Sequence, residues 1–250
     1  KCFELVESDI IEMKDIPADF KLTANQQIQK KCIDGSVHID KDKIKGWLDK
    51  LEYPLYYLDF ETYQTAVPIY DGTRPYQQIP FQFSLHVQKE EGGSLEHVSF
   101  LAKGQENPMK EFISRLKEAL GDKGSIIVYN QSFEKARIKE CAEMFPEYKE
   151  WSEEVLKRIV DLWVPFRNFW YYNPAQKGSA SIKKVLPCFG KDYSGLEIGD
   201  GQTASLKYYE SVWGGLSSDE VEKIREGLEA YCEMDTMAEV VILEGLRGMI

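Results

Sequence analysis

Two carboxylates stand two residues apart at the end of an apolar run in the segment LYYLDFET, residues 55–62. The run predicts a buried strand, and side chains two apart on a strand share a face. Asp59 and Glu61 are therefore expected to point the same way, with Phe60 directed to the opposite layer. Like charges this close repel strongly unless a cation lies between them. The pair predicts either a cation site or, more simply, two carboxylates in water beyond the strand.

Two other segments place carboxylates at the ends of further predicted elements. VYNQSFEKARI, residues 128–138, puts Glu134 in the first turn of a helix, where the helix dipole favours an anion. YCEMDT, residues 231–236, puts Tyr231 and Asp235 on one helical face. Singly, these are an ordinary first-turn glutamate and a core tyrosine beside a solvated aspartate. Taken together with the strand pair, they form a set of hard oxygen ligands that suits Mg²⁺ or Mn²⁺ and not zinc.

The elements that must position these residues alternate between strands and helices. The order predicts a mixed α/β sheet flanked by helices. Strands are expected at 53–60, 79–88, 95–102, 125–130 and 158–166, and helices at 107–121, 132–145, 179–186 and 217–246, the last with a capping box at Ser217 and Glu220 and a possible bend at Gly227.

The composition of the chain excludes some classes of protein and favours others. No run approaches the roughly 18 apolar residues of a membrane span, and no signal peptide opens the chain. Five cysteines without a Cys-x-x-Cys pair favour a reducing cytoplasm. The net charge of −11 argues against a protein that coats nucleic acid. It does not argue against an enzyme that binds a short nucleic-acid end through metal ions. Residues 1–46 are predicted to be an arm or linker and 47–250 the main domain, and the initial Lys1 suggests a fragment of a longer chain.

In the order LDFET, VYNQSFEKARI, YCEMDT, these segments resemble the three motifs of the DEDD superfamily of 3′–5′ exonucleases, which share a ribonuclease-H-like fold. The Tyr231-x-x-x-Asp235 spacing resembles the tyrosine subclass, to which the proofreading domains of DNA polymerases belong. The resemblance covers about residues 53–248 and implies a ribonuclease-H-like α/β domain. It also implies two Mg²⁺ or Mn²⁺ ions. The implied ligands are Asp59, Glu61, Glu134 and Asp235, and Tyr231 is the residue that orients the attacking water. The family usually has aspartate where this chain has Glu134.

The function that this resemblance implies is a divalent-metal-dependent 3′–5′ exonuclease acting on DNA or RNA by a two-metal mechanism. Its partner is expected to be a single-stranded nucleic-acid 3′ end, and a second nuclease-like domain is expected N-terminal to it in a longer chain. Side chains expected near the substrate are Thr62, Arg74, Asn130 and Phe133. The alternatives are a non-catalytic nucleic-acid-binding or scaffold module with the same fold, and a phosphodiesterase acting on small nucleotides.

Other features of the sequence are less specific. The segment 167–184 interleaves aromatic and basic residues, as a stacking platform for single strands does, although such aromatics equally pack a core or a loop. His38, His86 and His97 show no spacing typical of metal ligands, so the sequence predicts no zinc site.

Overall fold

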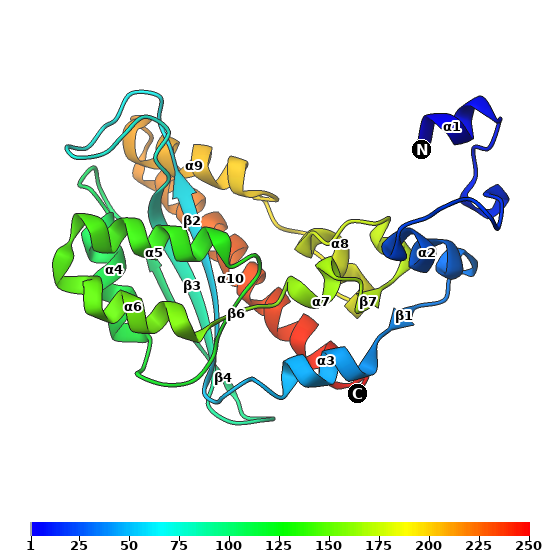
Figure 1. Ribbon diagram of the computed structural model, residues 1–250. Helices are drawn as coiled ribbons and strands as arrows, with labels where there is room; N and C mark the ends of the chain where they lie inside the picture. The colour runs from blue at the N-terminus through cyan, green and yellow to red at the C-terminus, as the bar shows by residue number, and fades with distance from the viewer. Residues whose placement is uncertain (1) are drawn as a thin grey trace.

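The computed structural model describes residues 2–250; Lys1, the first residue of the predicted arm, lies outside this range. At its centre is a mixed sheet of five strands in the order β4-β3-β2-β5-β6 (Figure 1). The strands are β2 (Leu55–Tyr63), β3 (Ile79–Gln88), β4 (Leu95–Leu101), β5 (Ile126–Val128) and β6 (Ile159–Asp161). The first three are antiparallel, and β5 and β6 run parallel to β2. The predicted mixed α/β sheet is confirmed.

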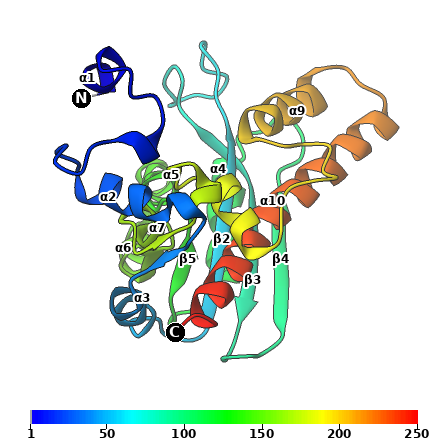
Figure 2. The ribbon, with the colours of Figure 1, turned by 90° about the vertical axis from the view of Figure 1, so that its right-hand side faces the viewer.

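Helices cover both faces of this sheet (Figures 1 and 2). They are α1 (Cys2–Glu7), α2 (Ala24–Lys31), α3 (Lys41–Leu48), α4 (Met109–Ala119), α5 (Ser132–Met144), α6 (Lys149–Arg158), α7 (Val164–Arg167), α8 (Ile182–Val185), α9 (Gly201–Trp213) and α10 (Ser218–Arg247). Figure 1 shows α4, α5 and α6 on one side of the sheet and the long α10 crossing the other. Two further short strands, β1 (His38–Ile39) and β7 (Tyr171–Tyr172), pair with each other in a separate antiparallel sheet. No helix within residues 2–250 is long and apolar enough to cross a lipid bilayer.

The two core clusters follow from the alternation of side chains along β2. Tyr56, Leu58 and Phe60 pack in the cluster that contains Phe112 of α4. Leu55 and Tyr57 pack in the other, with residues from the C-terminal half of α10. Asp59 and Glu61 continue this second face, so the period of two brings them to the side of the sheet that α10 crosses.

Several predicted elements differ from the observed ones at their ends. The strand expected at 158–166 is only the three residues of β6, and the chain then turns into α7, whose first turn contains Pro165. The predicted capping box of Ser217 and Glu220 is present, and α10 continues through Gly227 as one unbroken helix. The sequence analysis did not predict the helices α1, α3, α6, α7 and α9.

Helix α3 spans the predicted boundary between residues 46 and 47. Its Ile44 is fully buried and its Trp47 is 7% exposed, and both pack in the second core cluster with Leu246 of α10. Figures 1 and 2 both place α3 beside the C-terminal end of α10, whereas α1 stands away from the sheet. The last part of the predicted arm is therefore packed on the main domain.

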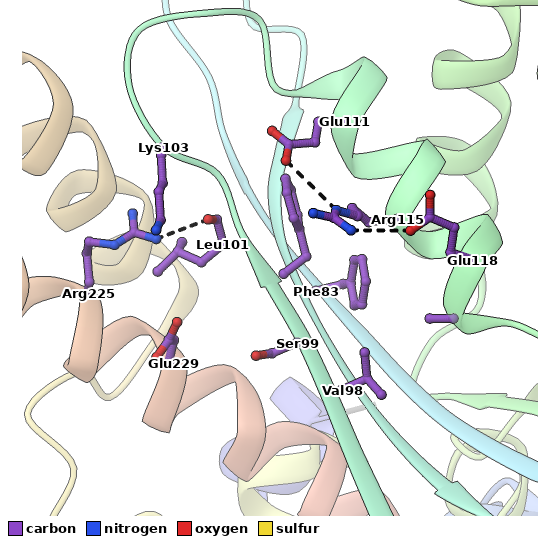
Figure 3. A pocket seen from close by; sticks show the side chains of 12 residues that line it. Phe83, Val98, Ser99, Leu101, Lys103, Glu111, Arg115, Glu118, Arg225 and Glu229 are labelled. Atoms are coloured by element: carbon purple, nitrogen blue, oxygen red, sulfur yellow. Dashed lines mark hydrogen bonds and ion pairs between the residues drawn. The ribbon is translucent and has the colours of Figure 1, made fainter.

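A groove of about 720 Å³ lies between β4, α4 and α10 (Figure 3). On one side Arg115 pairs with Glu111 and Glu118, and on the other Arg225 donates to the carbonyl oxygen of Leu101. None of the carboxylates predicted as metal ligands lines this groove.

Candidate metal centre

Three of the four predicted ligands converge in space. Carboxylate oxygens of Asp59, Glu61 and Asp235 lie within 4.8 Å of one another. The first two share a face of the central strand β2, and the third comes from α10 on that same face. Cys232, one turn before Asp235, has its Sγ 3.9 Å from the Oδ2 of Asp59, which places this part of α10 directly on the strand. The predicted orientation of the strand pair is confirmed.

Glu134 approaches the group from a different element. It lies in the first turn of α5, as predicted, and is 2% exposed. Its Oε2 has no hydrogen-bond partner among the described residues. The charge of Glu134 contributes to raising the pKa of Asp59, so the two carboxyl groups interact electrostatically. An unpartnered oxygen at this depth is costly unless the group is protonated or meets a cation.

Glu239 is a further buried carboxylate beside this group, and the sequence analysis missed it. It lies one turn after Asp235 on α10, is 1% exposed, and neither carboxylate oxygen has a hydrogen-bond partner among residues 2–250. Burial, followed by the charges of Asp59, Glu134 and Asp235, raises the pKa of Glu239 well above its ordinary value. The signal for it was present in the sequence, because residues 231, 235 and 239 repeat at the helical spacing of four.

Two further polar residues complete the surroundings of Asp235. The Tyr193 hydroxyl donates to the Oδ1 of Asp235 over 2.6 Å. The Lys183 ammonium lies over the rings of Tyr193 and Tyr231, 5.6 and 5.4 Å from their centroids. Burial raises the pKa of both Glu61 and Asp235, and the charge of Lys183 opposes this rise. The sequence placed Lys183 in a possible stacking segment. The structure puts its positive charge beside the carboxylates instead.

Tyr231 occupies the place predicted for it, on the same helical face as Asp235, and is 4% exposed. Burial and then the charges of Asp235, Glu61 and Asp59 raise the pKa of its phenol above the ordinary value of 10.0. The phenol is therefore protonated at neutral pH and is available as a hydrogen-bond donor.

A pocket of about 510 Å³ opens beside the carboxylates. Glu61 lines this pocket, together with two of the predicted substrate residues, Thr62 and Phe133. The rest of the lining comes from Gln64, Gln78 and the N-terminal part of α9: Gly201, Gln202, Ser205 and Leu206. A Cβ at Gly201 would lie 3.4 Å from the Glu61 Oε2, so α9 begins close against the site.

The other two predicted substrate residues make contacts of their own. Asn130 adopts a left-handed φ of 76°, and its backbone N–H donates to Asp161 Oδ1 over 3.0 Å. Asn130 thus shapes the turn between β5 and Glu134. Arg74 is paired with Glu140 of α5 over 2.7 Å and is not among the residues that line the pocket.

Comparison with known proteins gives a family but no assigned activity. Residues 56–181, half of the chain, match the model of a domain of unknown function, DUF2779. The chain belongs to the DUF2779 family. The matched part contains Asp59, Glu61 and Glu134 and ends before Tyr231 and Asp235.

Similarity to individual relatives extends beyond residues 56–181 of this DUF2779 chain. The uncharacterised protein MG366 of Mycoplasma genitalium is 28% identical over an alignment of 231 residues, which covers 84% of this chain and 34% of the relative. The uncharacterised protein UU173 of Ureaplasma parvum is 28% identical over an alignment of 229 residues, which covers 80% of this chain and 32% of the relative. The chain thus spans about a third of the length of these relatives. No solved structure matches it.

The carboxyl groups of the metal-free site hold protons to unusually high pH. Burial is the main cause in each case, and it raises the pKa of Glu61 to about 8, that of Glu134 to about 8 and that of Asp235 to about 6. For Asp59, burial, then the charges of Asp235 and Glu61, raise the pKa well above 3.8. Such shifts are expected where carboxylates crowd together with no cation present.

These pKa values predict how the stability of the metal-free protein depends on pH. Between the ordinary carboxyl pKa of 4.5 and about 8, the folded state binds more protons than the unfolded state. The free energy of unfolding should therefore fall as the pH rises through this window. Urea unfolding at a series of pH values, with chelator present, measures the slope. Glu61→Gln should make the fall shallower, and an unchanged slope in that variant would show that Glu61 does not hold the extra proton.

Proposed function

We propose that this chain is a divalent-metal-dependent 3′–5′ exonuclease that hydrolyses phosphodiester bonds of DNA or RNA. The observation that carries the proposal is the meeting of Asp59, Glu61 and Asp235 within 4.8 Å. Two buried glutamates accompany them, and within residues 2–250 one oxygen of Glu134 and both oxygens of Glu239 have no hydrogen-bond partner. Carboxylates crowded in this way favour a cation between them.

The sheet supports the ribonuclease-H-like fold that the sequence motifs imply. Its order is β4-β3-β2-β5-β6, with three antiparallel strands followed by two that run parallel to β2. The carboxylates lie on the central strand of this sheet and on the helices beside it, which is where nucleases with this fold carry their metal ligands.

The donor atoms fit Mg²⁺ or Mn²⁺. All are carboxylate oxygens, which these hard cations prefer, and five carboxylates supply enough charge for two ions. Asp59, Glu61 and Asp235 would hold one ion, and Asp59 with Glu134 would hold the other. When bound, a pair of such ions lowers the pKa of water and neutralises charge on the leaving oxygen.

The remaining residues position the reacting groups. Tyr231 keeps its proton and donates a hydrogen bond, so we assign it to orienting the attacking water and not to removing the water's proton. Tyr193 donates a hydrogen bond to one oxygen of Asp235 and so holds that carboxylate in place. Lys183 balances part of the negative charge of the carboxylates and is placed to meet a phosphate.

The pocket beside Glu61 supports binding of a chain end. Phe133 offers an aromatic face to a base, while Gln64, Gln78 and Gln202 offer amide groups for hydrogen bonds. The protein has a net charge of −11, so it has few spare cations to hold a second strand. A single-stranded 3′ end is therefore the substrate that we propose, and DNA and RNA are the two forms to compare.

The direct test incubates 5′-labelled single-stranded DNA and RNA with the protein and Mg²⁺ or Mn²⁺. A ladder of products shortened one nucleotide at a time from the 3′ end is expected, slowed by a 3′-terminal phosphate. Cutting of a closed circular strand would show an endonuclease instead. Hydrolysis of dinucleotides alone would show a small-nucleotide phosphodiesterase, and binding without cutting in either metal would show a scaffold module.

A further inference from the structure

A second group of metal-binding side chains lies on the sheet apart from the carboxylates. His86 of β3 and His97 of β4 are direct partners across the two antiparallel strands. Their rings stack with centroids 4.5 Å apart. One nitrogen from each ring and one carboxylate oxygen of Glu233, on α10, lie within 4.8 Å of one another. The histidines are 11 positions apart along the chain, so only the pairing of the strands brings them together.

Hydroxyl groups hold one nitrogen of each ring. His86 Nδ1 is 2.9 Å from the Oγ1 of Thr236, and His97 Nε2 is 2.9 Å from the Oγ of Ser84. The two hydroxyls are 2.8 Å apart, and the Thr236 hydroxyl also donates to the Glu233 carbonyl. Histidines that bind metals are oriented in this way, with a polar partner on the nitrogen that does not bind.

The other ring nitrogens, Nε2 of His86 and Nδ1 of His97, have no hydrogen bond to the described residues. The Oε1 of Glu233 is 3.9 Å from His97 Nδ1. The Glu233 side chain is half exposed, so water has access from that side. Two imidazoles, one carboxylate and an open position for water are the ligand set of a four-coordinate zinc ion.

We propose that His86, His97 and Glu233 form a zinc site that links the edge of the sheet to α10. Its two nitrogen ligands suit zinc, in contrast to the all-oxygen set around Asp59, so each site selects its own class of cation. A bound ion would join β3, β4 and α10 at one point. Because Glu233 lies two residues before Asp235 on α10, that link would also fix the segment that carries the carboxylate site.

Cobalt gives a test that reports the geometry of the site. Co²⁺ replaces Zn²⁺ at such sites, and in a four-coordinate site it absorbs visible light much more strongly than in a six-coordinate oxygen site. Titration of the purified chain with Co²⁺ should produce this strong absorption at one equivalent, and Zn²⁺ should remove it. Asp59→Asn should leave the band unchanged, because that substitution alters only the carboxylate site.

Variants on the exposed side of the site decide the assignment. His97→Gln and Glu233→Gln should each weaken Zn²⁺ binding at least about 10-fold in calorimetric titrations. Glu229→Gln, an exposed glutamate one turn earlier on α10, is the matched control and should bind like the wild type. At about 100 times its Kd, Zn²⁺ should raise the Tm of the wild type by about 5 °C or more, and that of His97→Gln by less.

Three outcomes would overturn the proposal. The first is a cobalt spectrum with only weak, six-coordinate bands. The second is a strong band that His97→Gln leaves intact, and the third is a band that Asp59→Asn removes. Circular dichroism of each variant, recorded without metal, distinguishes loss of binding from loss of folding.

Discussion

Asp59→Asn is expected to lower the rate of phosphodiester hydrolysis by about 10³-fold. This is the upper end of what the loss of a single electrostatic contact costs in catalysis. Burial, and then the charges of Asp235, Glu61 and Glu134, raise the pKa of Asp59, so this carboxylate interacts electrostatically with the three other predicted ligands. It is therefore the residue best placed to contact both ions of the proposed pair. Asparagine keeps the shape of the side chain but removes the charge that a bridging ligand must supply.

The same substitution should not unfold the protein. Without metal, Asp59 is repelled by its neighbours, so the Tm of the Asp59→Asn variant in chelator should equal or exceed that of the wild type. Single-turnover cleavage of a labelled strand and thermal unfolding in chelator measure the two effects. Asp122→Asn, at an exposed position before β5, is the control and should retain full activity. An Asp59→Asn variant that cleaves at the wild-type rate would exclude the proposed metal mechanism.

Glu239→Met is expected to stabilise the metal-free protein by about 1–3 kcal/mol, the range in which a buried polar group without a partner is costly. Methionine is an unbranched side chain of similar length that fills the same space without a carboxyl group. Within residues 2–250, neither oxygen of Glu239 has a partner that meets hydrogen-bond geometry, and the side chain is 1% exposed, so the substitution mainly removes a desolvation cost. The expected rise in Tm is several degrees for a chain of this size.

Thermal unfolding in chelator, and again with Mn²⁺, measures this effect. Glu226→Met, an exposed position on the same helix, is the control for the helix propensity of methionine and should change the Tm little. If Glu239 assists cation binding, the gain in chelator should shrink when Mn²⁺ is present. A loss of stability in Glu239→Met under both conditions would show that the carboxyl group has a favourable contact in the folded protein.

The parts of the fold that rest on local pattern could be predicted from the sequence. Alternation along residues 55–61 gave both faces of β2, and the capping box at Ser217 marked the start of α10. Spacing also oriented Tyr231 and Asp235 together. The end of β6 was missed because an apolar run continues through Trp163, and Pro165 there begins a helix and does not extend the strand.

The missed site residues are those whose position depends on tertiary structure. Tyr193 reaches Asp235 from a segment between helices, where no periodicity indicates which way a side chain points. His86 and His97 become neighbours only through the register of β3 and β4. Glu239 is different, because its spacing of four from Asp235 can be seen in the sequence. Buried glutamates are rare, however, so the pattern alone favoured a residue exposed to solvent.

The packing of Cys232 against Asp59 has a consequence for how the chain folds. These residues are 173 positions apart, yet their side chains are 3.9 Å from each other. Strand β2 pairs with β3 across residues 64–78, and β3 pairs with β4 across residues 89–94, whereas α10 can dock only after nearly the whole domain has been synthesised. A nascent chain that lacks α10 contains Asp59, Glu61 and Glu134 but neither Asp235 nor Glu239. The chain is therefore expected to acquire a complete carboxylate group only in the final, long-range step of its folding.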